Sequence, residues 1–297
     1  MKKIKGSLSK PEPSTLVAIS ALSLCALLPL RVYQVTSLIE PETGFFKETN
    51  FTIPLFYGIG AAVIFLLMVL SFLNSKANRA RNVFATSKSL GIVAAVTAMT
   101  IIFNAVNSFS AFTVINSKYS AFEHGVYTSY LTKSGAAPLA LEALFAVLTA
   151  FFFIIYAISC FKKSSVLSSC KIISAAPAIW AICRIVYRFL EKISFVNISD
   201  LLLELIMTVF MIMFFIAFAQ VVTNVSPESV AWRLFGCGLP AAITAFIVSV
   251  PRIFLMVIGH SELIVNGYGF EPCDLALAVF IPLFLYQTTT VKAKENN

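Results

Sequence analysis

The chain has 297 residues, of which 59% are hydrophobic and only 12% are charged. A water-soluble protein carries about a quarter charged residues, so this composition excludes a soluble globular protein and indicates one that lies mainly in lipid. The net charge is +8, but the basic residues lie in short segments between apolar runs. They are topology signals rather than a surface for nucleic acid.

Eight runs along the chain are long and apolar enough to cross a bilayer core, which takes about 20 residues per helix. We therefore predict an all-α, polytopic integral membrane protein that forms a single transmembrane domain over residues 1–297. The predicted spans cover residues 15–37, 52–73, 89–115, 137–161, 171–190, 200–223, 229–258 and 274–290.

Basic residues in the connections predict how the spans are oriented. With the N-terminus in the cytoplasm, the outer connections hold only Lys47, Lys118, Lys133 and Lys192. The inner segments hold Lys2, Lys3, Lys5, Lys10, Lys76, Arg79, Arg81, Lys88, Lys162, Lys163, Lys171, Arg233, Lys292 and Lys294. This asymmetry follows the positive-inside rule and predicts a multi-pass cell-membrane protein with both termini in the cytoplasm.

Short matches between the two halves of the chain suggest a weak internal repeat. Arg31-Val-Tyr33-Gln ends the first predicted span, and Arg184-Ile-Val-Tyr187-Arg ends the fifth. Both of these spans run outward, so a duplication would give a parallel 4+4 repeat. Chance agreement between apolar segments of limited composition is the alternative.

The predicted helical hairpin over residues 180–207 carries four charged residues. Arg184 and Arg188 lie four residues apart before the turn, so they share one helix face. Asp200 and Glu204 have the same spacing after the turn. An antiparallel hairpin predicts that Arg188 faces Asp200 and that Arg184 lies level with Glu204. Charge inside a membrane span is rare and usually functional.

Polar residues from six predicted spans fall at one depth, in the outer half of the bilayer, when each helical residue rises about 1.5 Å. An unpaired charge near a helix centre costs about 2.5–3.5 kcal/mol on insertion scales, so these groups must pair, reach water or extend to the interface. The candidate ligand-binding residues in this layer are Arg31, Tyr33, Gln34, Asn104, Asn107, Glu142, Arg184, Arg188, Glu204 and Arg252.

The charge balance of the layer supports a hypothesis about function. Its four arginines exceed the acids Glu142, Asp200 and Glu204 by one, and arginine suits carboxylate and phosphate groups. We therefore expect an outward-facing site for a small anionic or zwitterionic solute, in a permease or binding protein. We expect an anionic ligand to supply the negative charge that pairs with Arg31. The nearest expected partner of Arg31 within the chain is Glu142.

Two other hypotheses remain open. In the first, the protein is a non-catalytic subunit or scaffold of a membrane complex, and its charged layer is a structural network of ion pairs. In the second, it is a membrane transferase that acts on lipid headgroups, because interfacial arginines also suit lipid phosphates. The expected partners are thus the lipid bilayer, a small anionic solute or a membrane protein.

The sequence contains no motif of a known catalytic or metal chemistry. HExxH, GxSxG and Walker A sequences are absent, and the two histidines, His124 and His260, fall in predicted outer loops. We therefore expect no catalytic residue, no metal ligand and no cofactor, and we favour a protein without enzymatic activity.

Overall fold

The computed structural model describes residues 13–73, 87–118, 135–162, 171–190, 198–223, 227–265 and 267–295. Within these ranges every secondary-structure element is helical, apart from one isolated bridge between Ile39 and Phe46. The predicted all-α class is confirmed.

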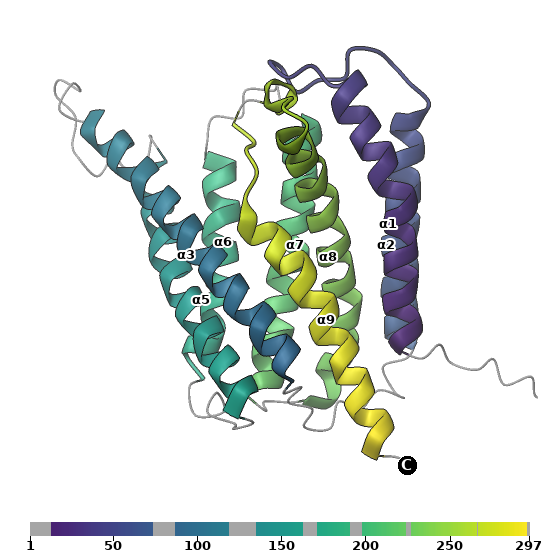
Figure 1. Ribbon diagram of the computed structural model, residues 1–297, viewed down its shortest axis with the longest axis vertical. Coiled ribbons are helices and arrows are strands. Elements are labelled where there is room, and N and C mark those ends of the chain that lie inside the picture. The colour runs from purple at the N-terminus through teal and green to yellow at the C-terminus, as the bar shows by residue number, and fades with distance from the viewer. Residues whose placement is uncertain are drawn as a thin grey trace, which may run out of the picture.

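The helices follow one another as an up-and-down bundle. The α-helices are α1 (Pro13–Tyr33), α2 (Thr52–Leu73), α3 (Lys88–Ser117), α5 (Ala136–Lys162), α6 (Ala176–Leu190), α7 (Ile198–Val222), α8 (Pro227–Val257) and α9 (Pro272–Glu295). Shorter helical segments are η1 (Gln34–Leu38), η4 (Ile173–Ala175) and η5 (Ser261–Leu263). The connections that follow η1 and α8 lie at the upper end of the bundle, and the C-terminal end of α9 lies at the lower end (Figure 1).

Six of the described helices are long and apolar enough to cross a membrane, namely α1 together with η1, α2, α3, α5, α7 and α8. Helix α6 and the apolar part of α9 fall short of the ~20 residues that a bilayer core requires. Helix α6 has 15 residues, and the apolar part of α9 covers Pro272–Thr288. The membrane-embedded class is therefore supported, whereas the predicted number of eight spans is not confirmed.

The predicted span 171–190 differs most from the helix that forms there. Residues 171–172 form a turn, η4 follows, and α6 begins only at Ala176. Pro177 lies in the first turn of α6, where proline is favoured because the N–H group that it lacks would have no acceptor within the helix. The apolar run extends into the preceding turn, so hydropathy alone places the start of the helix too early.

The packing does not confirm the predicted 4+4 repeat. In the second half of the chain α7 packs extensively along α8, whereas α2 and α3, the corresponding pair of the first half, make no extensive contact. Helix α3 packs along α5, and both α1 and α2 pack against α8. The two halves therefore differ in arrangement, and α1 and α2 form a pair at one side of the bundle (Figure 1).

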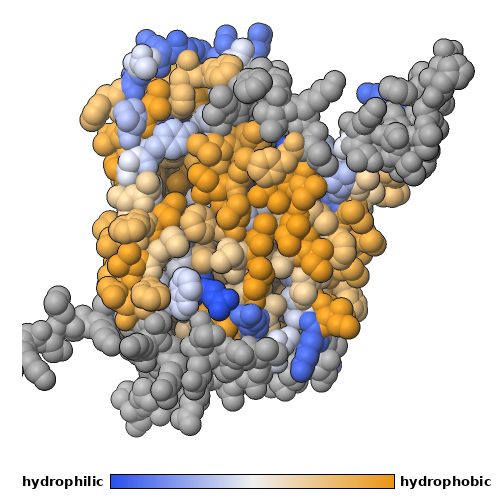
Figure 2. Space-filling model, turned by 180° about the vertical axis from the view of Figure 1, so that it is seen from behind, coloured by the Kyte–Doolittle hydropathy of each residue, from blue (hydrophilic) through white to orange (hydrophobic). Residues whose placement is uncertain are grey.

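A broad hydrophobic band covers the middle of the molecule, with hydrophilic residues gathered toward its upper and lower edges (Figure 2). Large apolar side chains are exposed along several helices, for example Phe65 on α2, Phe103 on α3 and Phe151 on α5. Water-soluble monomers rarely expose apolar patches of this extent. The band is the surface expected for a protein whose surroundings are lipid hydrocarbon.

The interior below the charged upper end is aromatic. Helix α8 is the most enclosed of the six candidate spans, with 67% of its apolar window buried. Beside it, Phe218 of α7 packs edge-on against Phe284 of α9, with ring centroids 4.9 Å apart. Phe152 and Phe153 of α5 belong to the same fully buried cluster. The lower half of the bundle is thus filled by interlocking rings.

The close packing of α7 against α8 can be tested by a substitution at Gly238. A Cβ atom at Gly238 on α8 would come within 2.8 Å of Phe214 Cδ2, and Phe214 is itself fully buried. Gly238→Ala should therefore lower the free energy of unfolding by about 1–3 kcal/mol, the usual cost of overpacking, measured by thermal unfolding in detergent. Gly58→Ala on α2 is the control, because nothing lies within 4 Å of the added Cβ. Equal losses at both positions would contradict the packing of α7 against α8.

Candidate functional site

Charged side chains from five helices meet near the upper end of the bundle and form one continuous series of ion pairs, which we call the ion-pair chain. In order, it runs Arg31, Asp200, Arg252, Glu204, Arg188, Glu271, Arg184 and Asp274. Positive and negative groups alternate along it, so its four arginines balance its four acids. The predicted layer of charge thus exists at one end of the bundle, although its membership differs from the prediction.

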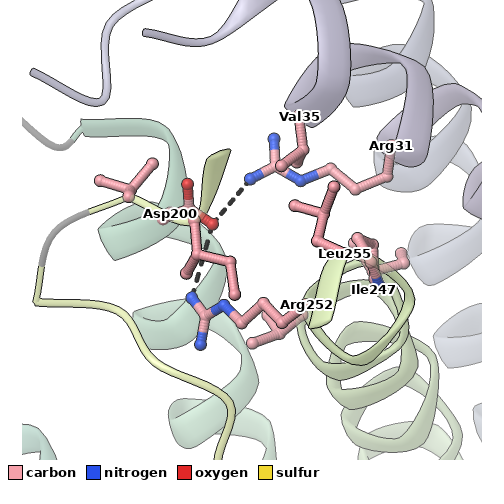
Figure 3. Close-up of a pocket in the computed structure, with 10 residues that line it drawn as sticks. Arg31, Val35, Asp200, Ile247, Arg252 and Leu255 are labelled. Carbon is pink, nitrogen blue, oxygen red and sulfur yellow. Dashed lines mark hydrogen bonds and ion pairs between the residues drawn. The ribbon is translucent and has the colours of Figure 1, made fainter. Parts of the chain in front are cut away.

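The first half of the ion-pair chain joins α1, α7 and α8 (Figure 3). Arg31 Nη2 lies 2.9 Å from Asp200 Oδ1, and Arg252 Nη2 lies 3.4 Å from the same oxygen. Arg252 Nη1 also donates a hydrogen bond to Glu204 Oε1, at 2.7 Å. None of these four side chains belongs to a residue more than 6% exposed. The two arginines therefore approach Asp200 from different helices inside a site that is shielded from water.

The second half joins α6 and α7 to the start of α9. Arg188 Nε lies 3.1 Å from Glu204 Oε2, and Arg188 Nη2 lies 3.1 Å from Glu271 Oε1. Arg184 Nη2 lies 2.7 Å from Glu271 Oε2 and 2.7 Å from Asp274 Oδ2. The ring of Tyr268 covers the guanidinium of Arg188, whose central carbon is 5.4 Å from the ring centroid. Such aromatic contacts add to the stabilisation of a desolvated arginine.

The register predicted for the 180–207 hairpin is wrong by one helical turn. Arg188 pairs with Glu204 and not with Asp200. Arg184 pairs with Glu271 and Asp274 and makes no ion pair with Glu204. Charges outside the hairpin determine the pairing, because arginines on α1 and α8 attract Asp200, and acids at the start of α9 attract Arg184.

The expected pair of Arg31 and Glu142 is also wrong. The carboxylate partner of Arg31 is Asp200, and Arg31 Nη1 donates hydrogen bonds to Ser199 Oγ at 3.0 Å and to Gln34 Oε1 at 3.4 Å. Glu142 lies on α5 and accepts a hydrogen bond from Ser108 of α3 at 3.5 Å. Helix α1 packs mainly on α8 and α2, so its arginine does not reach α5.

The remaining candidate residues divide into two groups. Gln34 is buried and donates to the carbonyl oxygen of Thr52 at 3.1 Å, and Asn104 donates to Glu271 Oε2 at 3.4 Å. Asn107 is exposed, and Tyr33 is 45% exposed. Gln34 and Asn104 therefore bond to members of the ion-pair chain, whereas the ligand-binding roles of the exposed Asn107 and Tyr33 stay predictions.

Glu271 and Asp274 are the site residues that sequence reasoning missed. Glu271 comes directly before Pro272, Asp274 follows this proline by two residues at the start of α9, and both bind Arg184. Acids at a helix N-terminus are favourable because of the helix dipole, and an acid on each side of a helix-starting proline was the available signal. With these two acids included, the predicted surplus of one positive charge does not exist.

A small pocket adjoins the first half of the ion-pair chain. Its charged lining is Arg31, Asp200 and Arg252 (Figure 3). The rest of the lining is apolar and consists of Val35, Ile247, Val248, Pro251, Leu255, Ile264 and Val265. Its free volume has room for about one water molecule. In this conformation the arginines are thus satisfied by protein acids, and a solute would need the pocket to widen.

Burial raises the pKa of Glu271, the carboxyl in the connection before α9. The guanidinium of Arg184 opposes this rise, and the negative charge of Asp274 adds to it. Glu271 therefore loses its charge at a higher pH than a free glutamate does, so acidification weakens its pairing with Arg184 and Arg188.

Glu271, Cys273 and Asp274 also form a group whose potential ligand atoms all lie within 4.8 Å of one another. The donor set does not fit a metal ion well, because Arg184 already contacts both carboxylates at 2.7 Å. A metal ion would have to displace this guanidinium. We assign the group to the ion-pair chain.

Relationships to known proteins give no further assignment of these residues. No protein-family model matches the chain. No curated protein and no solved structure matches it either. The functional argument therefore rests on the chemistry of the ion-pair chain and of the pocket beside it.

Proposed function

We propose that the protein is a binding protein or permease of the cell membrane that recognises a small anionic or zwitterionic solute between Arg31 and Arg252. The observation that carries this proposal is their convergence on one oxygen of Asp200, beside the pocket. A carboxylate or phosphate on a ligand offers the same acceptor geometry as Asp200 and could bind both guanidinium groups.

The second oxygen of Asp200 supports the zwitterionic part of the proposal. Asp200 Oδ2 is buried and has no hydrogen-bond partner among the described residues, which is costly for a charged acceptor. An amino group on the solute would satisfy this oxygen while the acidic group of the solute meets the arginines. The two ends of an amino acid or a similar zwitterion would then match the two kinds of charge in the site.

Entry of a solute requires the pocket to open, and the α1–α2 pair is the element placed to open it. This pair lies at one side of the bundle and packs mainly on α8 (Figure 1). The ion pair from Arg31 to Asp200 is its link to the ion-pair chain. A ligand that replaces Asp200 as the partner of Arg31 would release this link and widen the pocket toward the upper end.

The proposal includes an eight-span topology with one transmembrane domain over residues 1–297 and both termini in the cytoplasm. Its support is that α6 and α9 lie within the same bundle as the six candidate spans, and that the C-terminal end of α9 lies at the lower end (Figure 1). Lys88, Lys162 and Lys171 also lie at helix ends away from the ion-pair chain. Cations on that side fit the positive-inside rule if the ion-pair chain faces outward.

A second candidate function is a structural subunit of a membrane complex. The specific observation in its favour is the neutrality of the ion-pair chain, in which each arginine already has an acidic partner. In that case the chain of charges holds the helices in register, and no solute is needed to complete it.

A thermal-shift screen of carboxylates, phosphate and amino acids on the purified protein distinguishes the two candidates. A ligand at a hundredfold excess over its Kd adds about 2.7 kcal/mol of stability, so at least one anionic or zwitterionic compound should raise the Tm. Arg31→Gln should abolish this rise. Lys47→Gln, which removes an exposed positive charge from the connection after α1, should keep it.

The structural candidate predicts a different result from the same preparation. No compound raises the Tm, or Lys47→Gln loses the rise as fully as Arg31→Gln does. A stoichiometric protein partner that co-purifies in mild detergent, together with either result, would replace the binding proposal with the structural one.

A further inference from the structure

Glu142 stands apart from the ion-pair chain. It is 4% exposed, in the second turn of α5. Its hydrogen bond comes from the hydroxyl of Ser108, at 3.5 Å, and among the described residues it makes no ion pair. A buried carboxylate with so little compensation is strongly unfavourable, and such groups are normally neutralised.

The arginines nearest to Glu142 are already engaged. Arg184 contacts Glu271 and Asp274, and Arg188 contacts Glu204 and Glu271. Asn104 and Ser108, one turn apart on α3, donate to Glu271 and Glu142, so these two carboxylates lie on the same side of α3 and repel each other when both are ionised. The four arginines of the ion-pair chain are already balanced by its four acids. Glu142 is a fifth acid, for which none of these four arginines remains.

The side-chain oxygen of Asn104, on the same helix as Ser108, is a second buried polar group without a hydrogen-bond partner among the described residues. Asn104 lies one helical turn before Ser108 on α3, so the two side chains share one face. Its amide nitrogen donates to Glu271, but its oxygen Oδ1 is buried without a hydrogen-bond partner among the described residues. The Asn104 oxygen on α3 and the Glu142 carboxylate on α5 therefore both need a hydrogen-bond donor.

We propose that Glu142 is a proton-binding site at the junction of α3, α5 and α6. Its carboxylate takes one proton from water at the upper end of the bundle, an O–H bond forms, and the negative charge disappears. The neutral acid supplies a donor in the neighbourhood of the unpaired Asn104 oxygen. A proton suits this place better than a metal ion, because hard cations need about six oxygen ligands, and among the described residues Ser108 supplies the hydrogen bond to Glu142.

Glu142 is placed to transmit its protonation state to the ion-pair chain through Glu271. When Glu142 is neutral, Glu271 is free of its repulsion and holds Arg184 and Arg188. When Glu142 is ionised, two carboxylates compete for the same arginines. The titratable and charged groups that act with it are Cys183, Arg184 and Arg188 on α6, Glu271 before α9 and Cys273 at its start.

Infrared spectroscopy tests the site directly, because a protonated carboxylic acid has a carbonyl stretching band that a carboxylate lacks. The protein is measured in lipid nanodiscs at a series of pH values, without any anionic solute. We expect a band at neutral pH that disappears in a single titration at higher pH. Glu142→Gln should lack this band, and Glu48→Gln, at an exposed position in the α1–α2 connection, should keep it.

The stability of Glu142→Gln gives a second readout. Glutamine imitates the neutral acid in size and polarity, so this variant should melt within about a degree or two of the wild type at neutral pH, if ~1 kcal/mol shifts Tm by a few degrees. If Glu142→Gln fails to fold, Ser108→Ala decides the question. It removes a donor to the ionised carboxylate and should move the titration of the band to higher pH.

Three results would overturn the proposal. One is the absence of a Glu142-dependent band at any pH where the protein is folded. Another is a titration that Ser108→Ala leaves in place. The third is a band that disappears when choline in the buffer is replaced by Na⁺, because the carboxylate would then bind a metal ion. Since no anionic solute is present, the proton site is tested separately from the proposed function.

Discussion

Glu204→Gln should lower the free energy of unfolding by about 3–5 kcal/mol, the usual cost of removing one partner from a buried ion pair. Glu204 is 2% exposed and contacts two arginines, Arg252 at 2.7 Å and Arg188 at 3.1 Å. Glutamine keeps the size of the side chain but leaves both guanidinium groups short of negative charge. Thermal or denaturant unfolding in detergent measures the loss.

The matched control is the same substitution on the neighbouring helix α5. Glu142 is as deeply buried as Glu204 but has no ion pair among the described residues, so Glu142→Gln should cost little. If both variants lose the same stability, burial rather than pairing determines the effect. The order of the ion-pair chain would then be wrong at Glu204.

The second large effect is expected at the other end of the ion-pair chain. Arg184→Gln removes the cation that contacts both Glu271 and Asp274, and Asp274→Asn removes one of its two acids. Each single variant should lose about 3–5 kcal/mol, because a buried charge is left without compensation. The double variant should lose less than the sum of the two, with a coupling energy of about 0.5–3 kcal/mol.

Glu204 supplies the control for this double-mutant cycle. Arg184 and Glu204 make no direct ion pair among the described residues, although the sequence predicted one. The cycle between Arg184→Gln and Glu204→Gln should therefore show a smaller coupling energy than the cycle with Asp274→Asn. A larger coupling to Glu204 would restore the predicted hairpin register and contradict the ion pairs at the start of α9.

The positions of the long helices could be predicted because hydropathy is a local property. Residues 52–73 were predicted as a span and form α2, and residues 137–161 were predicted and lie within α5. The start of α6 could not be placed in this way. The apolar run begins before the helix does, and Pro177 marks the true first turn.

The partners of the charged residues could not be predicted, because pairing depends on which helices pack together. The depth of Arg31 follows from its position in α1, but its partner Asp200 lies 169 residues further along the chain. Asp274 begins the last predicted span, but its partner Arg184 lies 90 residues earlier, and the packing of α9 on α8 and α3 brings the two together. The existence of the charged layer was thus predictable, and its connectivity was not.

The sequence separations within the ion-pair chain also constrain how the protein is made. Arg31 is synthesised 169 residues before Asp200, and Arg184 is synthesised 90 residues before Asp274. At about 5–20 residues per second, α1 waits roughly 10–30 s in the translocon or the bilayer before its acidic partner emerges from the ribosome. During that time Arg31 must keep its charge near the interface or in water, as long side chains close to a helix end can do. Insertion of the early helices therefore precedes their final packing, and α9, which emerges after α6, completes the pairing of Arg184.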